Sequence, residues 1–301
     1  MLIRTESKLS GLVAGISAFL LWGILPLYWK GLAVLPSGLI LCHRIVWSCV
    51  LMLGIISLGG RWQEVRKIVA DARSFGLLCL SGGLLALNWL TYIWGVNAGF
   101  VLEASMGYYI NPLVNVLFGF LFFRDRLRVL QILAICLAAT GVGYVIVSYG
   151  RIPWIALTLA FTFGFYGLIR KKVKAEPMPG LLLEMMILGL PALGVLLLQG
   201  GSGMSPGQGR VWIWILLLGS GVITTLPLLL FTFCARSLRL VEVGILQYLA
   251  PTCMFLLGVF VFQEPFSGHR LIAFVFIWSG VIFYVLEAVF FLKKTAYISN
   301  K

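Results

Sequence analysis

The chain has 301 residues, of which 61% are hydrophobic and 11% are charged, and its formal net charge is +13. A soluble domain carries roughly 25% charged residues, so this composition excludes an ordinary soluble protein. In a membrane protein an excess of Lys and Arg is typical of loops that face the cytoplasm and anionic lipid, so no nucleic-acid partner is expected.

Long stretches without Asp, Glu, Lys or Arg follow one another along the chain, and each is close to the roughly 20 residues that cross a bilayer core. Lipid tolerates only helices or closed barrels, and the short alternating segments of a barrel are absent, so the predicted fold is an all-α membrane protein. Ten transmembrane helices are predicted, at residues 10–29, 36–58, 74–96, 101–123, 129–148, 152–170, 180–199, 211–234, 240–262 and 271–292.

The distribution of loop cations predicts the orientation of these helices. Eighteen Lys and Arg residues lie in the two termini and in the loops after the second, fourth, sixth and eighth helices, and four lie in the opposite loops. Loops rich in Lys and Arg stay in the cytoplasm, so both chain termini are expected there.

The chain also contains an internal repeat. A shift of 139 residues aligns 76–145 with 215–284 without a gap and with 15 identities. Near the start of each half, Trp22-Gly23 matches Phe163-Gly164 at a shift of 141. We therefore predict two repeats of five helices each, 1–150 and 151–301.

Five helices is an odd number, so the second repeat is expected to enter the membrane from the opposite side. The loop charges agree with this expectation, because three arginines between 124 and 128 have Arg270 alone as their counterpart after the ninth helix. An inverted repeat is typical of secondary transporters, in which two antiparallel halves expose one site alternately. A transporter is therefore the predicted class.

Four segments resemble a known family, the EamA type of the drug/metabolite transporter (DMT) superfamily, and within it the RarD branch. They are LLWGILPLYWK (20–30), CHRIVWS (42–48), WLTYIWGVN (89–97) and GYYINPLVNVLFG (107–119). The resemblance implies a bacterial inner-membrane permease, and better-known relatives in the superfamily export amino acids and other metabolites. It also implies a translocation cavity between the third, fourth, eighth and ninth helices, with the first and sixth at its sides.

Arg44 lies within the second predicted helix, about 12 Å from its outer end at 1.5 Å per residue. An arginine at the centre of a membrane helix costs roughly 2.5–3.5 kcal/mol, so its side chain is expected to face the bundle interior. It either binds substrate and takes part in gating, or caps backbone carbonyls of a broken helix. The neighbouring His43 is either a satisfied core residue or a carrier of a coupled proton.

Three carboxylates are further candidates. A shift of 140 residues places Arg44 on Glu184, so the two are hypothesised to share one network, unless Glu184 is hydrated at its helix end. Glu103 and Glu242 are repeat equivalents at the starts of the fourth and ninth helices. They either complement their helix dipoles or serve as gates at opposite faces.

Prolines predict breaks in the middle of three helices, at Pro112, Pro227 and Pro251, because proline frees the carbonyl four residues earlier. Polar side chains at the same depth are the predicted lining of the cavity, and aromatic side chains surround them. An aromatic cavity with few charges suits an amphipathic or zwitterionic solute. The polar candidates are Asn88, Asn111, Asn115 and Gln247, and the aromatic ones are Tyr92, Tyr108 and Tyr248.

An enzyme is not expected. The chain has two histidines, His43 and His269, and neither a zinc-protease motif nor a phosphate-binding loop, so no catalytic residue, metal or cofactor is predicted. The expected partners are a small-molecule solute, membrane lipid and a coupled proton. A channel or a lipid-translocating protein is the alternative function, and the absence of saturation would distinguish it from a carrier.

Overall fold

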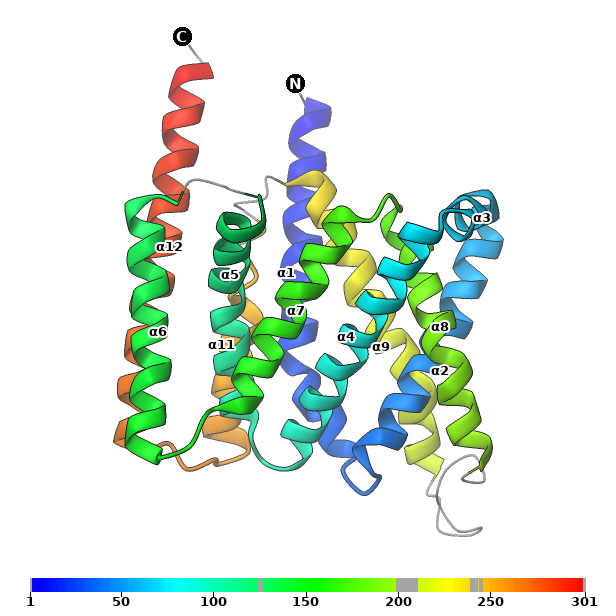
Figure 1. Ribbon diagram of the computed structural model, residues 1–301, viewed down its shortest axis with the longest axis horizontal. Coiled ribbons are helices and arrows are strands. Elements are labelled where there is room, and N and C mark those ends of the chain that lie inside the picture. The colour runs from blue at the N-terminus through cyan, green and yellow to red at the C-terminus, as the bar shows by residue number, and fades with distance from the viewer. Residues whose placement is uncertain (1, 124–126, 199–210, 239–242, 244–245, 300–301) are drawn as a thin grey trace.

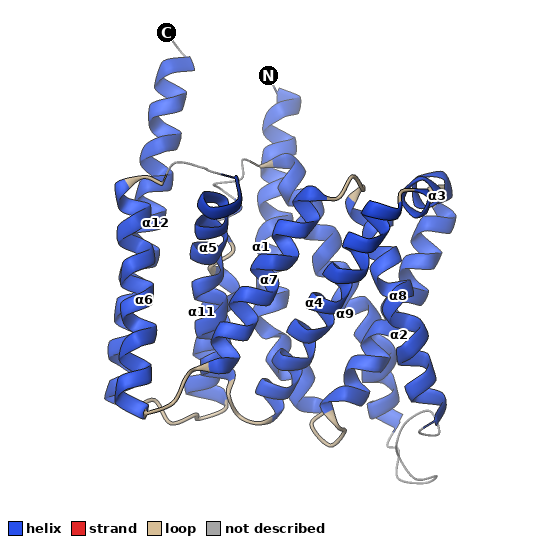
Figure 2. Cartoon of the chain, in the orientation of Figure 1, coloured by secondary structure: helices blue, strands red, loops and turns tan. Residues whose placement is uncertain are grey.

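The structure is a computed structural model that describes residues 2–123, 127–198, 211–238, 243 and 246–299. The described part of the chain consists of helices joined by short loops and contains no β-strand (Figure 2). The helices are α1 (Leu2–Gly31), α2 (Ser37–Leu58), α3 (Trp62–Ala70), α4 (Ala72–Asn97), α5 (Val101–Phe123), α6 (Val129–Tyr149), α7 (Trp154–Lys172), α8 (Pro177–Leu198), α9 (Val211–Ser237), α11 (Leu249–Leu256) with the π-helical turn η1 (Leu257–Val261), and α12 (Gly268–Ser299).

Eight of the described helices are long and apolar enough to cross a membrane, namely α1, α2, α4, α5, α6, α8, α9 and α12. Two shorter apolar helices, Trp154–Arg170 and Leu249–Val261, occupy the places of two predicted spans, 152–170 and 240–262. The chain is therefore a helical multi-pass membrane protein. The predicted span 240–262 begins in residues outside the described part of the chain.

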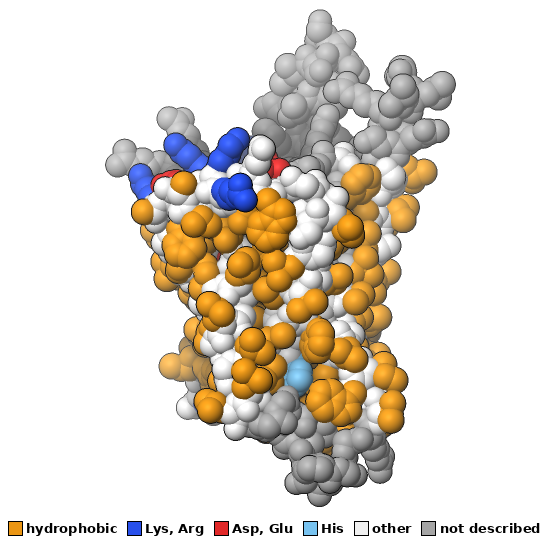
Figure 3. All heavy atoms as spheres, turned by 90° about the vertical axis from the view of Figure 1, so that its right-hand side faces the viewer, with side chains coloured by type: hydrophobic (Ala, Val, Ile, Leu, Met, Phe, Trp, Pro, Cys, Tyr) orange, Lys and Arg blue, Asp and Glu red, His pale blue; other side chains and the backbone are white. Residues whose placement is uncertain are grey.

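Both chain ends lie at the same face of the bundle, at the top of Figure 1, which we call the terminal face. We call the other face the opposite face. Lys and Arg side chains gather along the edge of the terminal face, while hydrophobic side chains cover the flank below it (Figure 3). This distribution matches a protein whose flank contacts lipid and whose terminal face contacts water.

The sequence did not predict α3, which lies in the cation-rich loop between α2 and α4. This short helix is amphipathic, with Val65 and Ile68 buried and its other side chains at the surface. It packs against α4 and α8 at the terminal face (Figure 1). The helix is much shorter than a membrane span, so a prediction based on the length of apolar stretches does not detect it.

The helix breaks predicted at Pro112 and Pro227 are wrong, whereas a turn at residues 247–248 interrupts the chain just before Pro251. Helix α5 continues through Pro112 and α9 continues through Pro227. Pro251 lies in the first turn of α11, where a missing backbone N–H removes no intrahelical hydrogen bond. Packing against neighbouring helices keeps a membrane helix continuous at proline, so the residue type alone does not predict a break.

The helix neighbours form a regular pattern. Helix α2 packs against α8, and α6 packs against α12. The other close pairs include α1 with α9, α4 with α7, α5 with α7, α1 with α11, α2 with α9, α5 with α11, and α4 with α8. The core between them is apolar, and its largest fully buried side chains include Trp29, Phe274 and Leu182.

Helices α6 and α12 run antiparallel and approach each other closely at two glycines. A Cβ atom on Gly141 would lie 2.9 Å from the carbonyl oxygen of Ala273, and one on Gly280 would lie 2.8 Å from that of Ala134. Real Cβ atoms do not approach backbone oxygens this closely, so each site requires glycine for this helix spacing.

We expect Gly141→Val and Gly280→Val to destabilise the protein by similar amounts, about 1–3 kcal/mol each, because each adds atoms to a contact without space. Thermal unfolding in detergent measures the loss. The matched control is Gly143→Val on the same helix, where a Cβ meets nothing within 4 Å. An equal loss of stability in Gly143→Val would show that the close contact between α6 and α12 does not cause the destabilisation.

Candidate functional site

Arg44 is the eighth residue of α2, about 10 Å along the helix from Ser37 at 1.5 Å per residue. Arg44 is 4% exposed, so its guanidinium faces the bundle interior and does not contact lipid. Helix α2 is continuous around it. The interpretation that Arg44 caps carbonyls of a broken helix therefore has no support from the described residues.

Aromatic rings cover the Arg44 guanidinium. Its central carbon lies 3.9 Å from the ring centre of Trp89 in α4 and 5.0 Å from that of Trp29 in α1. Its Nε donates a hydrogen bond of 2.9 Å to Oγ1 of Thr224 in α9. Four helices thus meet at one cation, and cation–π contacts stabilise it in place of a carboxylate.

Several donors in this cluster have no acceptor. Nη1 of Arg44, Nε1 of Trp29 and the hydroxyl of Tyr92 are buried, and none of them has a hydrogen-bond partner within the described part of the chain. Tyr92 also contacts the ring of Tyr108 edge-on, with 5.7 Å between ring centres. A buried donor without an acceptor costs about 1–3 kcal/mol, so these three donors together are a substantial cost to the ligand-free protein.

Glu184 of α8 lies in a second, separate cluster. It is fully buried and accepts a hydrogen bond from the hydroxyl of Ser81, and a longer one of 3.4 Å from Tyr166. Its Oε1 lies 3.6 Å from Nη1 of Arg170, which forms an ion pair with it. The interpretation that Glu184 is hydrated at its helix end is therefore wrong.

The hypothesised network between Arg44 and Glu184 is not present, because the two residues lie at different depths. Both are the eighth residue of a 22-residue helix, but α2 and α8 run in opposite directions (Figure 1). Cys49 Sγ lies 3.8 Å from the Cβ position of Gly189, which sets the register of the pair. In this register Glu184 is level with residue 54, about 15 Å along the helix from Arg44.

At the opposite face, three helix ends are capped by charged residues from other parts of the chain. Glu103 of α5 accepts a 3.0 Å hydrogen bond from the backbone N–H of Ile155 in the first turn of α7. Glu264, which follows η1, accepts hydrogen bonds from the backbone N–H groups of Val101 (2.6 Å) and Leu102 (3.0 Å) at the start of α5. Lys30 Nζ donates to two carbonyls at the end of α4, at 3.2 and 3.3 Å.

Glu103 lies in the first turn of α5, as the dipole interpretation requires, and its carboxylate also caps α7. Glu264 was not among the residues predicted from the sequence, although the repeat aligns it with another carboxylate, Asp125. Burial raises the pKa of the Glu264 carboxyl above its usual range, and the two N–H donors act in the opposite direction. Glu242, the repeat equivalent of Glu103, lies outside the described residues.

We expect Glu264→Ala to speed hydrogen exchange at the amides of Val101 and Leu102, because it removes their only described side-chain acceptor. Loss of a helix cap costs about 0.5–2 kcal/mol, or roughly two- to thirtyfold in exchange rate. Exchange at Ile155 should not change. Glu103→Ala is the reciprocal control, with faster exchange at Ile155 and Ala156 and no change at Val101 and Leu102. A general increase in both variants would contradict these assignments.

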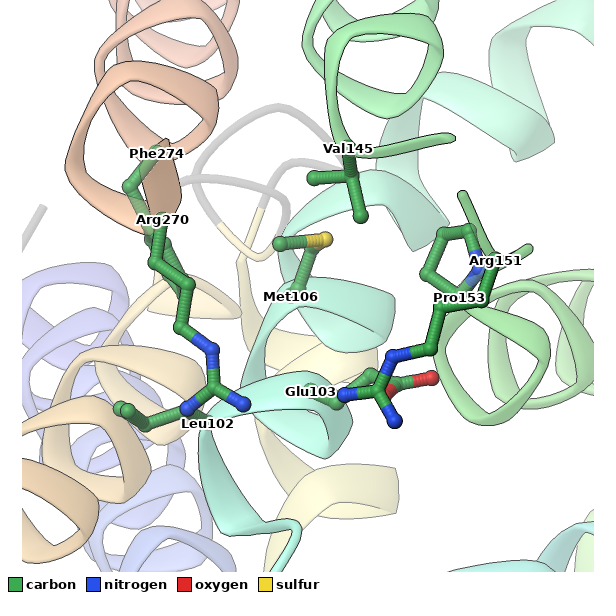
Figure 4. Close-up of a pocket in the computed structure, with 8 residues that line it drawn as sticks. All are labelled: Leu102, Glu103, Met106, Val145, Arg151, Pro153, Arg270 and Phe274. Carbon is green, nitrogen blue, oxygen red and sulfur yellow. The ribbon is translucent and has the colours of Figure 1, made fainter. Parts of the chain in front are cut away.

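A small cavity of about 30 Å³ opens beside Glu103 at this face. Figure 4 shows the guanidinium groups of Arg151 and Arg270 directed to the region around Glu103, from the loop before α7 and from α12. The full lining is Leu102, Glu103, Met106, Val145, Arg151, Pro153, Arg270 and Phe274. The cavity holds only one or two water molecules by volume, so it is too small for a metabolite.

The other predicted cavity residues divide between structural contacts and a third group. Asn88 donates hydrogen bonds to the carbonyl of Leu159 (3.0 Å) and to Oγ1 of Thr162 (2.9 Å), so it links α4 to α7. His43 is buried, with its ring edge-on to Trp214.

The third group consists of residues on α5 and in the turn directly before α11. Asn111 is buried and accepts a hydrogen bond from the exposed Asn115, and Tyr109 stacks on Tyr248 with 6.2 Å between ring centres. The partly buried Gln247 directly precedes Tyr248. The predicted residues therefore do not form one site, and only Tyr92 and Tyr108 belong to the cluster around Arg44.

Comparison with known proteins agrees with this architecture. The model of the EamA-like transporter family matches residues 9–147 and 151–286. One solved structure superimposes with a TM-score of 0.58 at 17% identity, covering 93% of this chain and 99% of that one, which supports the fold alone.

Bacterial relatives match over nearly their full length. An uncharacterized transporter of Vibrio cholerae is 45% identical, with 92% of each chain covered. The uncharacterized transporter YojE of Bacillus subtilis is 44% identical, with 95% of this chain and 96% of the relative covered. Protein RarD of Escherichia coli is 38% identical over 95% and 97%. The resemblance to RarD proteins is confirmed, and the chain belongs to the EamA-like transporter family of membrane transporters.

Proposed function

We propose that the chain is a secondary carrier that moves a small amphipathic or zwitterionic solute across the bacterial cytoplasmic membrane by alternating access. The observation that carries the proposal is the mirrored placement of two buried charges, Arg44 and Glu184. Each is the eighth residue of its helix, and the helices run in opposite directions. A carrier with two inverted halves places equivalent residues at such mirrored depths.

The pairs of neighbouring helices support an inverted repeat of five plus five helices. When α1, α2, α4, α5 and α6 are exchanged for α7, α8, α9, α11 and α12, the pair α1–α9 becomes α7–α4, and α5–α7 becomes α11–α1. The pairs α2–α8 and α6–α12 map onto themselves. This exchange is what a two-fold axis in the membrane plane produces, with the repeats at 1–150 and 151–301.

The glycine contacts between α6 and α12 support the same axis. A shift of 139 residues converts Ala134 into Ala273 and Gly141 into Gly280, so it exchanges the two contacts for each other. In this arrangement α7 and α11 with η1 complete a set of ten crossings, and the terminal face is cytoplasmic. The solute pathway passes between the halves, past Arg44.

Two experiments test the proposal. Reporter fusions at both chain ends should both report a cytoplasmic location, and reporters in different compartments would overturn the orientation.

Metabolite profiling of cells with and without the protein should then identify the solute for proteoliposomes. Uptake of that labelled solute should saturate and should be accelerated by unlabelled solute on the other side. Linear flux, or flipping of labelled lipid alone, would replace the carrier with a channel or a lipid-translocating protein.

A further inference from the structure

We infer that Arg44 is the binding centre for a carboxylate group of the transported solute, which deepens the proposed function and rests on it. The cluster around Arg44 contains a buried cation, and no carboxylate of the described residues forms a salt bridge with it. A buried charge without an opposite charge is costly, and the protein retains this one in the middle of an apolar bundle. The missing partner is therefore an anion that arrives with the solute.

The free donors around Arg44 define the geometry of that anion. The face of the guanidinium lies against Trp89, and its Nε is bonded to Thr224, so its Nη1 edge remains available. Nε1 of Trp29 and the hydroxyl of Tyr92 are also donors without acceptors in the part of the chain that the structure describes. A planar carboxylate offers two oxygens with several lone pairs, which can accept from more than one of these donors at once.

The apolar surroundings define the rest of the solute. Tyr108 and the two tryptophans supply ring surfaces, and no acidic side chain among the described residues lies in this cluster to bind an amine. An organic cation would be repelled by Arg44, and a neutral solute would leave its charge uncompensated. An organic carboxylate with an apolar or aromatic body satisfies both the donors and the rings. A zwitterion would bind through its carboxylate end.

The first test measures binding to the purified protein without transport. A panel of carboxylates from propionate to indole-3-acetate, each paired with its own neutral amide, is added at equal concentrations, and the unfolding temperature is recorded. At least one carboxylate should raise this temperature and its amide should not. If every carboxylate behaves like its amide, the inference is overturned.

Variants test the residue. Arg44→Gln should weaken binding of the active carboxylate by roughly ten- to a hundredfold, the usual effect of a lost charge-assisted hydrogen bond. Arg61→Gln is the control, because Arg61 is partly exposed and already has Glu64 as its carboxylate partner. The same carboxylate should raise the unfolding temperature of this control by as much as it raises that of the wild type. Equal binding by Arg44→Gln would overturn the assignment.

A second variant keeps the test valid even if Arg44→Gln does not fold. Tyr92→Phe removes a buried hydroxyl that has no partner in the described structure, so the ligand-free protein should be as stable as the wild type or more stable. Its affinity for the carboxylate should fall about three- to tenfold. A residue with only a packing role would not combine these two effects. Unchanged affinity would show that Tyr92 does not bind the carboxylate, and would contradict the inference that these donors bind one anion together.

The inference and the carrier proposal can fail separately. If carboxylates bind through Arg44 but the liposomes show no saturable exchange, the binding centre stands and the carrier mechanism fails. If the solute identified by profiling exchanges across liposomes but lacks a carboxylate, and carboxylates do not compete with it, the carrier stands and the inference fails.

Discussion

Replacing Arg44 with glutamine is expected to abolish transport while the protein remains in the membrane. The side chain lies in the interior, at the meeting point of α1, α2, α4 and α9, and glutamine cannot replace its charge or its planar group of donors. Removal of a buried cation also lowers the cost of inserting α2, by roughly the 2.5–3.5 kcal/mol that an arginine costs at a helix centre. Transport and insertion should therefore change in opposite directions.

Uptake into proteoliposomes and the amount of protein in the membrane fraction measure the two effects. Arg44→Lys is the informative companion, because it keeps the charge and loses the planar guanidinium that stacks on Trp89. We expect it to retain a small part of the activity. Wild-type uptake by Arg44→Gln would show that the cation has no part in transport.

Replacing Glu184 with leucine is expected to cause a large loss of stability. The carboxylate is fully buried and pairs with Arg170, and removal of one partner of a buried ion pair typically costs about 3–5 kcal/mol. Thermal unfolding in detergent, followed by the loss of monodisperse protein, measures the effect.

The control is the double variant Glu184→Leu/Arg170→Leu, which removes both charges. Replacing a whole buried pair with apolar residues is often neutral, so the double variant should recover most of the stability that Glu184→Leu loses. A double variant less stable than the single one would show that Arg170 contributes mainly through other contacts. This pair lies near the terminal face, far from Arg44, so its effect on stability should not depend on added carboxylate.

The positions of the long helices could be predicted from the sequence because the bilayer imposes a minimum apolar length on every span. Helices such as α2 and α6 begin and end within a few residues of the predicted limits. The burial of Arg44 was predictable for the same reason, since a cation in lipid is too costly to face outward. Each of these predictions requires only a single segment or residue and the lipid or water around it.

Predictions that depend on two segments were less successful. The pairing of Arg44 with Glu184 was wrong because α2 and α8 run in opposite directions, so the eighth residues of the two helices lie at different depths. The true partner of Glu184 is Arg170, from the neighbouring end of α7. The cap that Glu264 provides for α5 was also invisible, because it depends on which helix ends lie side by side.

The caps at the opposite face have a consequence for how that face can open. Glu103 belongs to the first half of the chain and bonds to α7 of the second, while Glu264 belongs to the second half and bonds to α5 of the first. Separation of the halves on this side breaks both sets of bonds together. Each bond joins a carboxylate of one half to a backbone N–H of the other, and such a bond contributes a net of only about 0.5–1.5 kcal/mol. In the proposed carrier each half thus holds a helix start of the other, so opening on this side is a step that both halves share.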